Sequence, residues 1–262
     1  MAGAAVLERL TVPRAPVLWR VARVREVVEA TASAVTLVLD VDGWPGHVAG
    51  QHLDVRLTAE DGYQAQRSYS IASGPEDPRL ELTVERIDDG EVSPYLAGVV
   101  QAGDEFEVRG PVGGYFVWDI SSTGPLLLIG GGSGIVPLMS MLRHRRRADA
   151  AARARVPAVL LYSARTSEDL IYKEELETLA NGAGDDSLMV CITLTRDAPA
   201  GWRGLRGRVD RAMLEKVSAT VNKRPNVFVC GPTPFTEAVA TLLVELGHEP
   251  SQIRTERFGP TG

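Results

Sequence analysis

The sequence has 262 residues, 44% of them hydrophobic, which favours two domains over one. Its formal net charge of −6 argues against a general nucleic-acid binder, which would carry a basic surface. The two cysteines, Cys191 and Cys230, do not form a CxxC pair, so the composition argues against a disulfide framework and a cysteine-bound metal cluster. No apolar run is long enough to span a membrane, and no secretion signal is recognisable, so we expect a cytoplasmic protein.

The first half of the chain is expected to be rich in short strands. Residues 1–16 have little periodicity and are predicted to be an N-terminal tail, to which we assign no function. From residue 17 onwards, short segments rich in Val, Leu and Thr are separated by Gly, Pro and Asp, a pattern typical of an antiparallel barrel or sandwich. The segment SPYLAGVV predicts one short helix, with Ser93 as its N-cap and Pro94 at its first position.

The second half of the chain has a different pattern of apolar residues. After residues 121–125, apolar strands alternate with helical stretches, from PLLLIGG to FTEAVATLLVEL, which predicts a parallel sheet with crossover helices. We place the boundary at Thr123, giving domains of residues 17–122 and 123–262. The arginine- and alanine-rich stretch at 143–157 predicts a helix end followed by a loop.

A glycine-rich turn follows the apolar segment at 126–129. The sequence GGGSGIVP at 130–137 leads into an amphipathic stretch, with the helix expected to begin at Pro137. Glycines allow the backbone to approach a pyrophosphate, and a helix N-terminus supplies free N–H groups, so this arrangement favours dinucleotide binding. Pro137 replaces the last glycine of the GxGxxG fingerprint, which argues against an ordinary Rossmann dehydrogenase. The alternative is a tight turn without a ligand.

A second motif, Arg67-Ser68-Tyr69-Ser70, lies at the end of a predicted strand. Alternation along a strand sends Arg67 and Tyr69 to one side. An arginine there can pair with a phosphate, a tyrosine can pack on a flat ring, and a serine can donate a hydrogen bond. Taken alone, the same residues would also suit an ordinary strand surface.

The order of these motifs resembles that of the ferredoxin–NADP reductase superfamily, in which a flavin-binding barrel precedes a nicotinamide-binding domain. The resemblance covers residues 17 to 259 and rests on RSYS at 67–70, GEVSPYL at 90–96 with GPVGGYF at 110–116, GGSGIVP at 131–137 and CGP at 230–232. It implies a six-stranded, Greek-key-like antiparallel β-barrel with one short helix, followed by an α/β domain with a parallel sheet. The four cysteines of a fused iron–sulfur domain, present in some relatives, are missing here.

The resemblance implies a set of flavin contacts in the first domain. Arg67 would hold the flavin phosphate, Tyr69 would pack against the isoalloxazine, and the Ser70 hydroxyl would lie near flavin N5. The further contacts that it implies are the ribityl chain and ring edge for Val84 and Glu85, and the pyrophosphate for Gly90, Val92 and Ser93. An N-cap role for Ser93 is compatible with a phosphate contact. The implied cofactor is FAD, because the helix start suits a dinucleotide pyrophosphate, with FMN as the alternative.

The second domain would supply the nicotinamide contacts. The resemblance implies that Gly132, Ser133 and Gly134 contact the nucleotide, and that Cys230 lies beside nicotinamide C4, followed by Gly231 and Pro232 of the same motif. The alternative for Cys230 is a small apolar residue at the end of a buried strand. Glu256 would lie near the flavin edge and relay a proton. Phe258 would cover the flavin ring, although Gly-Pro-Thr-Gly follows it where some relatives end on the stacking aromatic residue.

The choice of nicotinamide donor depends on the ribose 2′-position. A 2′-phosphate requires cationic donors, and arginine can bind it through two hydrogen bonds. Ser163 and Arg165 follow one predicted strand and Arg196 follows the next, with Arg208 as weaker support. We therefore favour NADPH over NADH, although NADH users of the superfamily can also carry arginines there.

Two further features are interpreted as structural. The four histidines, His47, His52, His144 and His248, form no grouping with ligand spacing, so we predict no metal. The basic run at 143–147 could bind an acidic electron acceptor, but a solvated helix end that complements the helix dipole is favoured.

The resulting hypothesis is a flavoprotein reductase that takes a hydride from NADPH onto FAD. A separate redox protein, such as a ferredoxin, a cytochrome or another oxidoreductase, would then accept the electrons. A reductase of free flavin or another small molecule is one alternative, and a non-catalytic flavin-binding subunit is another. The sequence does not identify the acceptor or the oligomeric state.

Overall fold

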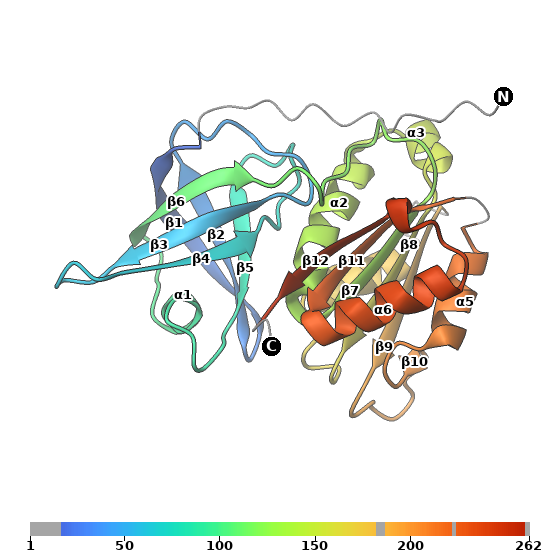
Figure 1. Cartoon of the computed structure of the whole chain (residues 1–262). Helices are drawn as coiled ribbons and strands as arrows, with labels where there is room; N and C mark the ends of the chain where they lie inside the picture. Colours follow the sequence, from blue (N-terminus) through green and yellow to red (C-terminus); the bar gives the residue numbers. More distant parts are fainter. Residues whose placement is uncertain (1–16, 182–186, 222–223, 260–262) are drawn as a thin grey trace.

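The protein is built around two sheets, one from each half of the chain (Figure 1). The structure is a computed structural model that describes residues 17–181, 187–221 and 224–259. The tail expected at residues 1–16, and residues 260–262 after Phe258, lie outside the described residues. No helix in the described ranges is long and apolar enough to cross a membrane.

The first sheet is antiparallel and closes into a barrel. Its strands are β1 (Trp19–Thr31), β2 (Ala34–Val41), β3 (His52–Thr58), β4 (Gln64–Ser70), β5 (Leu80–Glu85) and β6 (Glu105–Val112). They follow the order β4-β3-β6-β1-β2-β5, and a bridge between Ile71 and Leu82 joins the two outer strands. The predicted six-stranded antiparallel barrel is confirmed.

Alternating apolar residues fill the barrel. Leu37 and Leu39 of β2 and Leu82 and Val84 of β5 are fully buried in one cluster. Helix α1 (Ser93–Gly98) covers the end of the barrel and adds Leu96 to this core (Figure 1). Period-two alternation thus leaves the polar neighbours on the outer surface.

The start of α1 differs from the prediction. The N-cap residue is Val92, and Ser93 is the first residue of the helix, so Pro94 takes the second position. The Ser93 hydroxyl accepts a hydrogen bond from the Ile87 N–H at 3.1 Å and makes no capping bond. The predicted N-cap is wrong because this hydroxyl stabilises the preceding loop.

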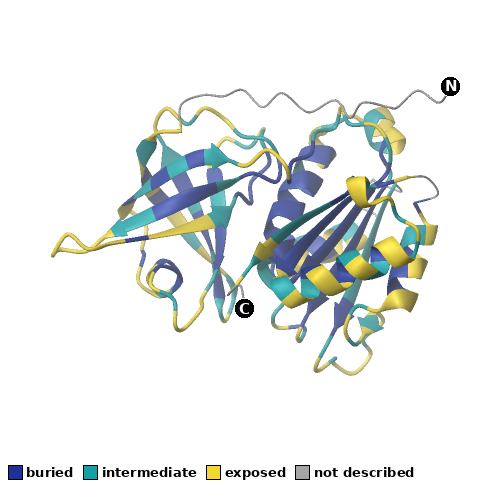
Figure 2. Cartoon of the chain, in the orientation of Figure 1, coloured by how far each residue is buried: buried dark blue, intermediate teal, exposed yellow. Residues whose placement is uncertain are grey.

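The second sheet is parallel. Its strands are β7 (Leu126–Gly131), β8 (Ala158–Ala164), β9 (Leu188–Leu194), β10 (Leu205–Arg206), β11 (Asn226–Pro232) and β12 (Ile253–Phe258), in the order β10-β9-β8-β7-β11-β12. Its longer helices are α2 (Ile135–Arg147), α4 (Lys173–Ala180), α5 (Arg211–Ala219) and α6 (Thr233–Glu245). Helices α2 and α4 pack on one face, and α5 and α6 on the other. Both faces are covered, so β7 and β8 are buried throughout (Figure 2).

Two features of this half depart from expectation. The turn of 3₁₀ helix η1 (Gly132–Gly134) leads into α2, which begins at Ile135 and not at Pro137. Helix α3 (Ala150–Arg155) forms where a loop was expected, because Asp149 accepts a hydrogen bond from the Ala152 N–H and caps an alanine-rich turn. A second 3₁₀ turn, η2 (Pro250–Gln252), precedes β12.

The basic end of α2 is not a solvated helix end. Arg143 is largely buried, and His144 and Arg145 are buried, whereas Arg146 and Arg147 are exposed. Arg145 donates a hydrogen bond to the Val156 carbonyl at 2.8 Å, and so binds the backbone directly after α3. The prediction of a solvated helix end is wrong for these three residues, because α2 is enclosed on one side by the barrel and on another by α3.

Candidate active site

The ends of β7 and β11 meet at a change of direction in the parallel sheet. The chain leaves β7 through α2 towards β8, and leaves β11 through α6 towards β12 on the opposite side. Ligands of open α/β sheets bind in the crevice beyond such a switch point. The strand ends here lie next to the barrel (Figure 1), so a ligand bound by this rule would lie between the two halves.

Close packing explains most of the glycines at this point. A Cβ at Gly134 would lie 2.2 Å from the Cys230 carbonyl oxygen. The glycine-rich turn at residues 130–134, called the glycine loop below, therefore packs directly on the end of β11. A Cβ at Gly131 or Gly231 would meet the Phe235 ring at 2.9 and 2.6 Å. Gly132 differs, with a φ of +56° and open space whose nearest neighbour is the Glu85 carboxylate at 3.9 Å. The loop therefore exposes its backbone at Gly132, facing the end of β5.

The RSYS motif lies on the edge strand β4. Tyr69 pairs with Leu53 and Arg67 with Val55 across the sheet, so both predicted ligands lie on the face of those core residues, as alternation predicts. Arg67 is exposed, and its Nη2 is 3.2 Å from the Glu91 carboxylate. Burial raises the pKa of the Tyr69 phenol, which therefore remains protonated.

The predicted pyrophosphate contacts lie together around the start of α1. A Cβ at Gly90 would come within 3.0 Å of the Ser93 Oγ, so the loop is tightly wound. Val92 is fully buried in the barrel core, as is Val84 of β5. Glu91, which sequence reasoning did not single out, accepts a hydrogen bond from Tyr63 as well as the Arg67 contact.

The carboxyl group of Glu256 lies at the junction of the two halves. Glu256 is opposite Cys230 in the pairing of β12 with β11, and Phe258 is opposite Pro232. The Oε1 atom of Glu256 lies 3.7 Å from His52 Nδ1 of the barrel. The Oε2 atom of Glu256 is buried without a hydrogen-bond partner among the described residues. Burial raises the pKa of Glu256 to about 7. The group therefore exchanges a proton near neutral pH.

His52 is a second residue that sequence reasoning missed. It was interpreted as a barrel strand residue, and it does lie on β3, directly opposite Ser70 of β4. Opposite residues of an antiparallel pair project to the same face, so His52 shares a face with Ser70 and also neighbours Glu256. Burial lowers the pKa of His52, which keeps the imidazole neutral at physiological pH. The pairing of strands 52–58 and 64–70 was the signal that could have found it.

Cys230 is a neutral thiol in this site. The side chain is buried at the end of β11. Burial, supported by the nearby Glu256 carboxylate, raises the pKa of the Cys230 thiol well above its usual value. Because the thiolate is the nucleophile, the geometry does not suit covalent catalysis by this cysteine.

Residues predicted for the ribose end of the nucleotide gather at the ends of β8 and β9. Ser163 is buried at the end of β8, opposite Gly131 of the glycine loop. Arg165 and Arg196 follow their strands, are exposed, and are joined by a hydrogen bond from the Arg196 N–H to the Arg165 carbonyl. Neither guanidinium makes an ion pair within the described ranges. Arg208 is exposed in the adjoining loop.

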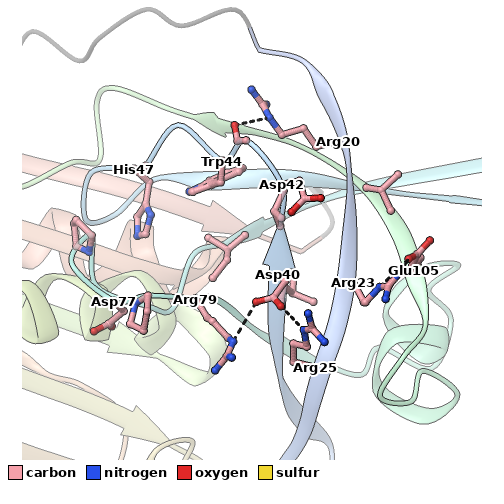
Figure 3. A pocket seen from close by; sticks show the side chains of 18 residues that line it. Arg20, Arg23, Arg25, Asp40, Asp42, Trp44, His47, Asp77, Arg79 and Glu105 are labelled. Atoms are coloured by element: carbon pink, nitrogen blue, oxygen red, sulfur yellow. Dashed lines mark hydrogen bonds and ion pairs between the residues drawn. The ribbon is translucent and has the colours of Figure 1, made fainter.

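A separate groove of about 830 Å³ lies on the barrel near β1 and β2 (Figure 3). None of the predicted site residues lines it. Its arginines bind groups of the groove itself, with Arg20 on the Gly43 carbonyl, Arg23 on Glu105, and Arg25 and Arg79 on Asp40. The crevice between the two sheets therefore remains the candidate active site.

Comparisons with known proteins agree with this architecture. The oxidoreductase FAD-binding domain model matches residues 23–117, and the oxidoreductase NAD-binding domain model matches residues 128–241. Ferredoxin–NADP reductase B of Sorangium cellulosum is 38% identical over 216 residues, which cover 80% of this chain and 84% of that protein. The glycine betaine monooxygenase reductase subunit of Chromohalobacter salexigens is 36% identical over 213 residues. These residues cover 81% of this chain but only 56% of that protein.

Solved structures share the fold. A cytochrome P450 reductase from Amycolatopsis matches with a TM-score of 0.78 and 26% identity, covering 94% of this chain and 72% of that one. The FAD/NAD-binding domain of a nitric oxide dioxygenase from Vibrio cholerae also gives a TM-score of 0.78, at 24% identity, covering 92% of this chain and 99% of that chain.

A closed barrel joined to a parallel sheet that changes direction between β7 and β11 defines a class of two-domain oxidoreductases that bind a flavin and a nicotinamide dinucleotide. The chain belongs to the ferredoxin–NADP reductase family.

Proposed function

We propose that this protein transfers a hydride from NADPH to FAD and passes the electrons to a separate redox protein. The observation that carries the proposal is the set of contacts that links Ser70, Glu256 and Cys230. Glu256 is opposite Cys230 and lies 3.7 Å from His52, which is opposite Ser70. Ser70, Glu256 and Cys230 come from β4, β12 and β11, and the glycine loop packs directly on the end of β11.

The residues of this crevice fit a flavin. The buried Glu256 Oε2 has no hydrogen-bond partner in the described part of the chain, so a polar ligand edge would satisfy it. Arg67 has one exposed carboxylate partner, which a phosphate could displace. When bound, the flavin supplies the hydride-accepting chemistry and the conversion of two-electron into one-electron transfer.

The chain itself supplies alignment and proton handling. Ser70 offers a hydroxyl at the end of β4, where it would donate a hydrogen bond to the cofactor edge. Glu256 would hold or release a proton there, with His52 as its polar neighbour at 3.7 Å. Cys230 would provide a neutral surface beside the nicotinamide. Gly132 would admit the dinucleotide backbone, and Phe258 would cover the outer side of the site.

The donor that we propose is NADPH. Arg165 and Arg196 are exposed at adjacent strand ends and make no ion pair within the described ranges, and Ser163 lies between them and the glycine loop. Such a site supplies the charge-assisted hydrogen bonds that a 2′-phosphate requires. NADH, which lacks that phosphate, would make fewer contacts.

The acceptor that we propose is a separate protein that carries a metal redox centre. Two cysteines are too few for a four-cysteine cluster in this sequence. The Chromohalobacter relative is named as a reductase subunit of a monooxygenase. Both cysteines are free thiols, which suits the reducing cytoplasm.

Anaerobic stopped-flow mixing of the flavin-loaded protein with NADPH, and separately with NADH, tests the donor. We expect rapid loss of the flavin absorbance with NADPH and slower loss with NADH. Turnover with a ferredoxin or cytochrome c should exceed turnover with free FMN. No loss of absorbance with either nucleotide would refute the enzymatic proposal, and faster loss with NADH would reverse the choice of donor.

A further inference from the structure

One face of α2 is bound along the barrel segment that follows β4. The residues on this face are spaced by three or four positions, so they share one side of the helix. They make four contacts with this segment: Ser140 Oγ to the Ser73 carbonyl at 2.7 Å, Arg143 to the Ala72 carbonyl at 2.9 Å, His144 to Glu76 at 2.6 Å and Arg147 to Asp77 at 2.6 Å. The basic run therefore joins the two halves of the protein.

Arg143 is the centre of this junction. Its guanidinium binds Glu81 of β5 at 2.8 Å and Glu175 of α4 through two hydrogen bonds of 2.7 and 3.2 Å. It also lies 4.9 Å from the centre of the Tyr172 ring. With a side chain only 20% exposed, Arg143 satisfies partners from both halves at once.

Tyr172 forms the second part of the junction. It is the one non-glycine residue with a positive φ in the described ranges, at 60°, a conformation that costs an aromatic residue free energy. Its hydroxyl lies 2.6 Å from Thr83 Oγ1 of β5, which in turn lies 2.8 Å from Thr36 Oγ1 of β2. The residue with the positive φ is therefore also the one whose hydroxyl contacts the barrel.

The junction lies very close to both halves of the candidate active site. Ala72 and Ser73 follow Ser70 by two and three residues, and Thr83 immediately precedes Val84 and Glu85. On the other side, α2 starts directly after the glycine loop. The segments expected to hold the hydride acceptor and the donor are thus connected through a few short, hydrogen-bonded links.

We propose that Arg143 and Tyr172 are positioning residues that set the separation and angle between the nicotinamide and flavin sites. This inference rests on the proposed function. Hydride transfer is highly sensitive to alignment, and a displacement of about 1 Å can cost a factor of about 100 in rate. Loss of the junction should therefore slow the transfer step more than it weakens binding of either cofactor.

A purely structural role would give a different result. Removal of Arg143 would leave the Glu81 and Glu175 carboxylates without their cationic partner, which destabilises the folded protein. If the role were only structural, unfolding and flavin retention would change without a specific effect on hydride transfer. The two roles are separated by comparing the transfer rate at saturating NADPH with the dissociation constant of NADP+. The long-wavelength absorbance that reports stacking of nicotinamide on flavin gives a second, independent readout.

The experiment uses the flavin-loaded protein and the variants Arg143→Gln and Tyr172→Phe. Arg146→Gln is the matched control, because Arg146 is exposed on the same helix and makes no ion pair within the described ranges. We expect Arg143→Gln to slow flavin reduction at least tenfold and Tyr172→Phe two- to fivefold. The NADP+ dissociation constant should change less than threefold, and the stacking absorbance should fall in both variants. The control should match the wild-type protein.

Each result bears on the proposal. Tyr172→Phe keeps the ring and removes one hydroxyl. This variant therefore tests the positioning role if Arg143→Gln fails to fold or loses its flavin. Wild-type reduction rates in the folded variants would overturn the positioning role, as would a loss of rate matched by an equal loss of NADP+ binding. Failure of the proposed function is recognised separately, because the wild-type protein itself would then not be reduced by NADPH or NADH.

Discussion

The carboxyl group of Glu256 remains protonated at a pH at which most glutamates are ionised. Burial raises its pKa to about 7, against about 4.3 for a glutamate in an unfolded chain. The folded protein therefore binds a proton that the unfolded chain releases between these values. The stabilising contribution is complete at about pH 4 and is lost as the pH rises through 7.

Glu256→Gln should remove this dependence. Because glutamine is neutral at every pH, we expect the flavin-free variant to be more stable than the wild-type protein at pH 8, by about 3 kcal/mol, and equally stable at pH 4. Urea unfolding at both pH values measures the difference. An equal difference at the two pH values would show that Glu256 does not titrate with a raised pKa.

Arg165 and Arg196 should determine nucleotide selectivity. Replacing either by alanine removes charge-assisted hydrogen bonds to a 2′-phosphate, so the KM for NADPH should rise about tenfold while that for NADH stays unchanged. Arg155→Ala is the control, because this exposed arginine ends α3 near the amino end of β8. Steady-state kinetics with both nucleotides test the prediction, and equal effects on both would contradict it.

Short motifs indicated many individual residues of the candidate site, while others depend on strand pairing. Ser70, Cys230 and Glu256 were chosen from motifs, and in the structure His52 links them: it is opposite Ser70 and lies 3.7 Å from Glu256, which is opposite Cys230. His52 could not be recognised in the same way, because its position depends on a partner strand and on β12, which comes some 200 residues later. The burial of Arg143 likewise depends on a barrel segment that is distant in sequence.

At the scale of elements, the glycine loop is constrained by the strand that it touches. Gly134→Ala would force a Cβ to within 2.2 Å of the Cys230 carbonyl, so the loop or the end of β11 must move. We expect a loss of about 2 kcal/mol or more in stability, together with weaker nucleotide binding. Thermal unfolding and NADP+ titration measure these effects.

Gly98→Ala is the matched control for that substitution. A Cβ at Gly98, the last residue of α1, would meet nothing within 4 Å. We expect unchanged or slightly higher stability, because alanine reduces the entropy of the unfolded chain. A Gly134→Ala variant as stable as the Gly98→Ala variant would show that the loop relaxes freely.

Periodicity predicted most elements because their burial follows a regular pattern along the strand or helix. The strand–helix alternation that begins at Leu126 gave the parallel sheet, and the short apolar segments before it gave the barrel. The strand Ile253–Phe258 is harder to recognise, because it lies at the edge of the sheet and carries Arg254, Glu256 and Arg257. Its pairing with β11, and not its composition, makes it a strand.

At the scale of the whole molecule, the two halves share a core. Phe116 and Trp118, which precede the boundary expected at Thr123, are buried in the same cluster as Leu138 and Met141 of α2. Neither half can cover this surface alone. The protein should therefore unfold as one unit.

Calorimetry tests this coupling. We expect one thermal transition, with a calorimetric enthalpy equal to the van't Hoff enthalpy, because exposure of Phe116 and Trp118 would destabilise each half once the other unfolds. Two separated transitions would show that the halves are independent domains joined only at their surfaces.

The sealed thiol of Cys230 also affects how long such a protein remains active. Reduced flavins react with oxygen to give hydrogen peroxide, and peroxide oxidises cysteine through the thiolate. Burial raises the pKa of Cys230 and also that of the half-buried Cys191, so both sulfurs stay in the unreactive form. At the site that we propose for the flavin, Cys230 would thereby be protected from the peroxide that a reduced flavin generates, and the packing around the thiol would also limit oxidative inactivation of the protein.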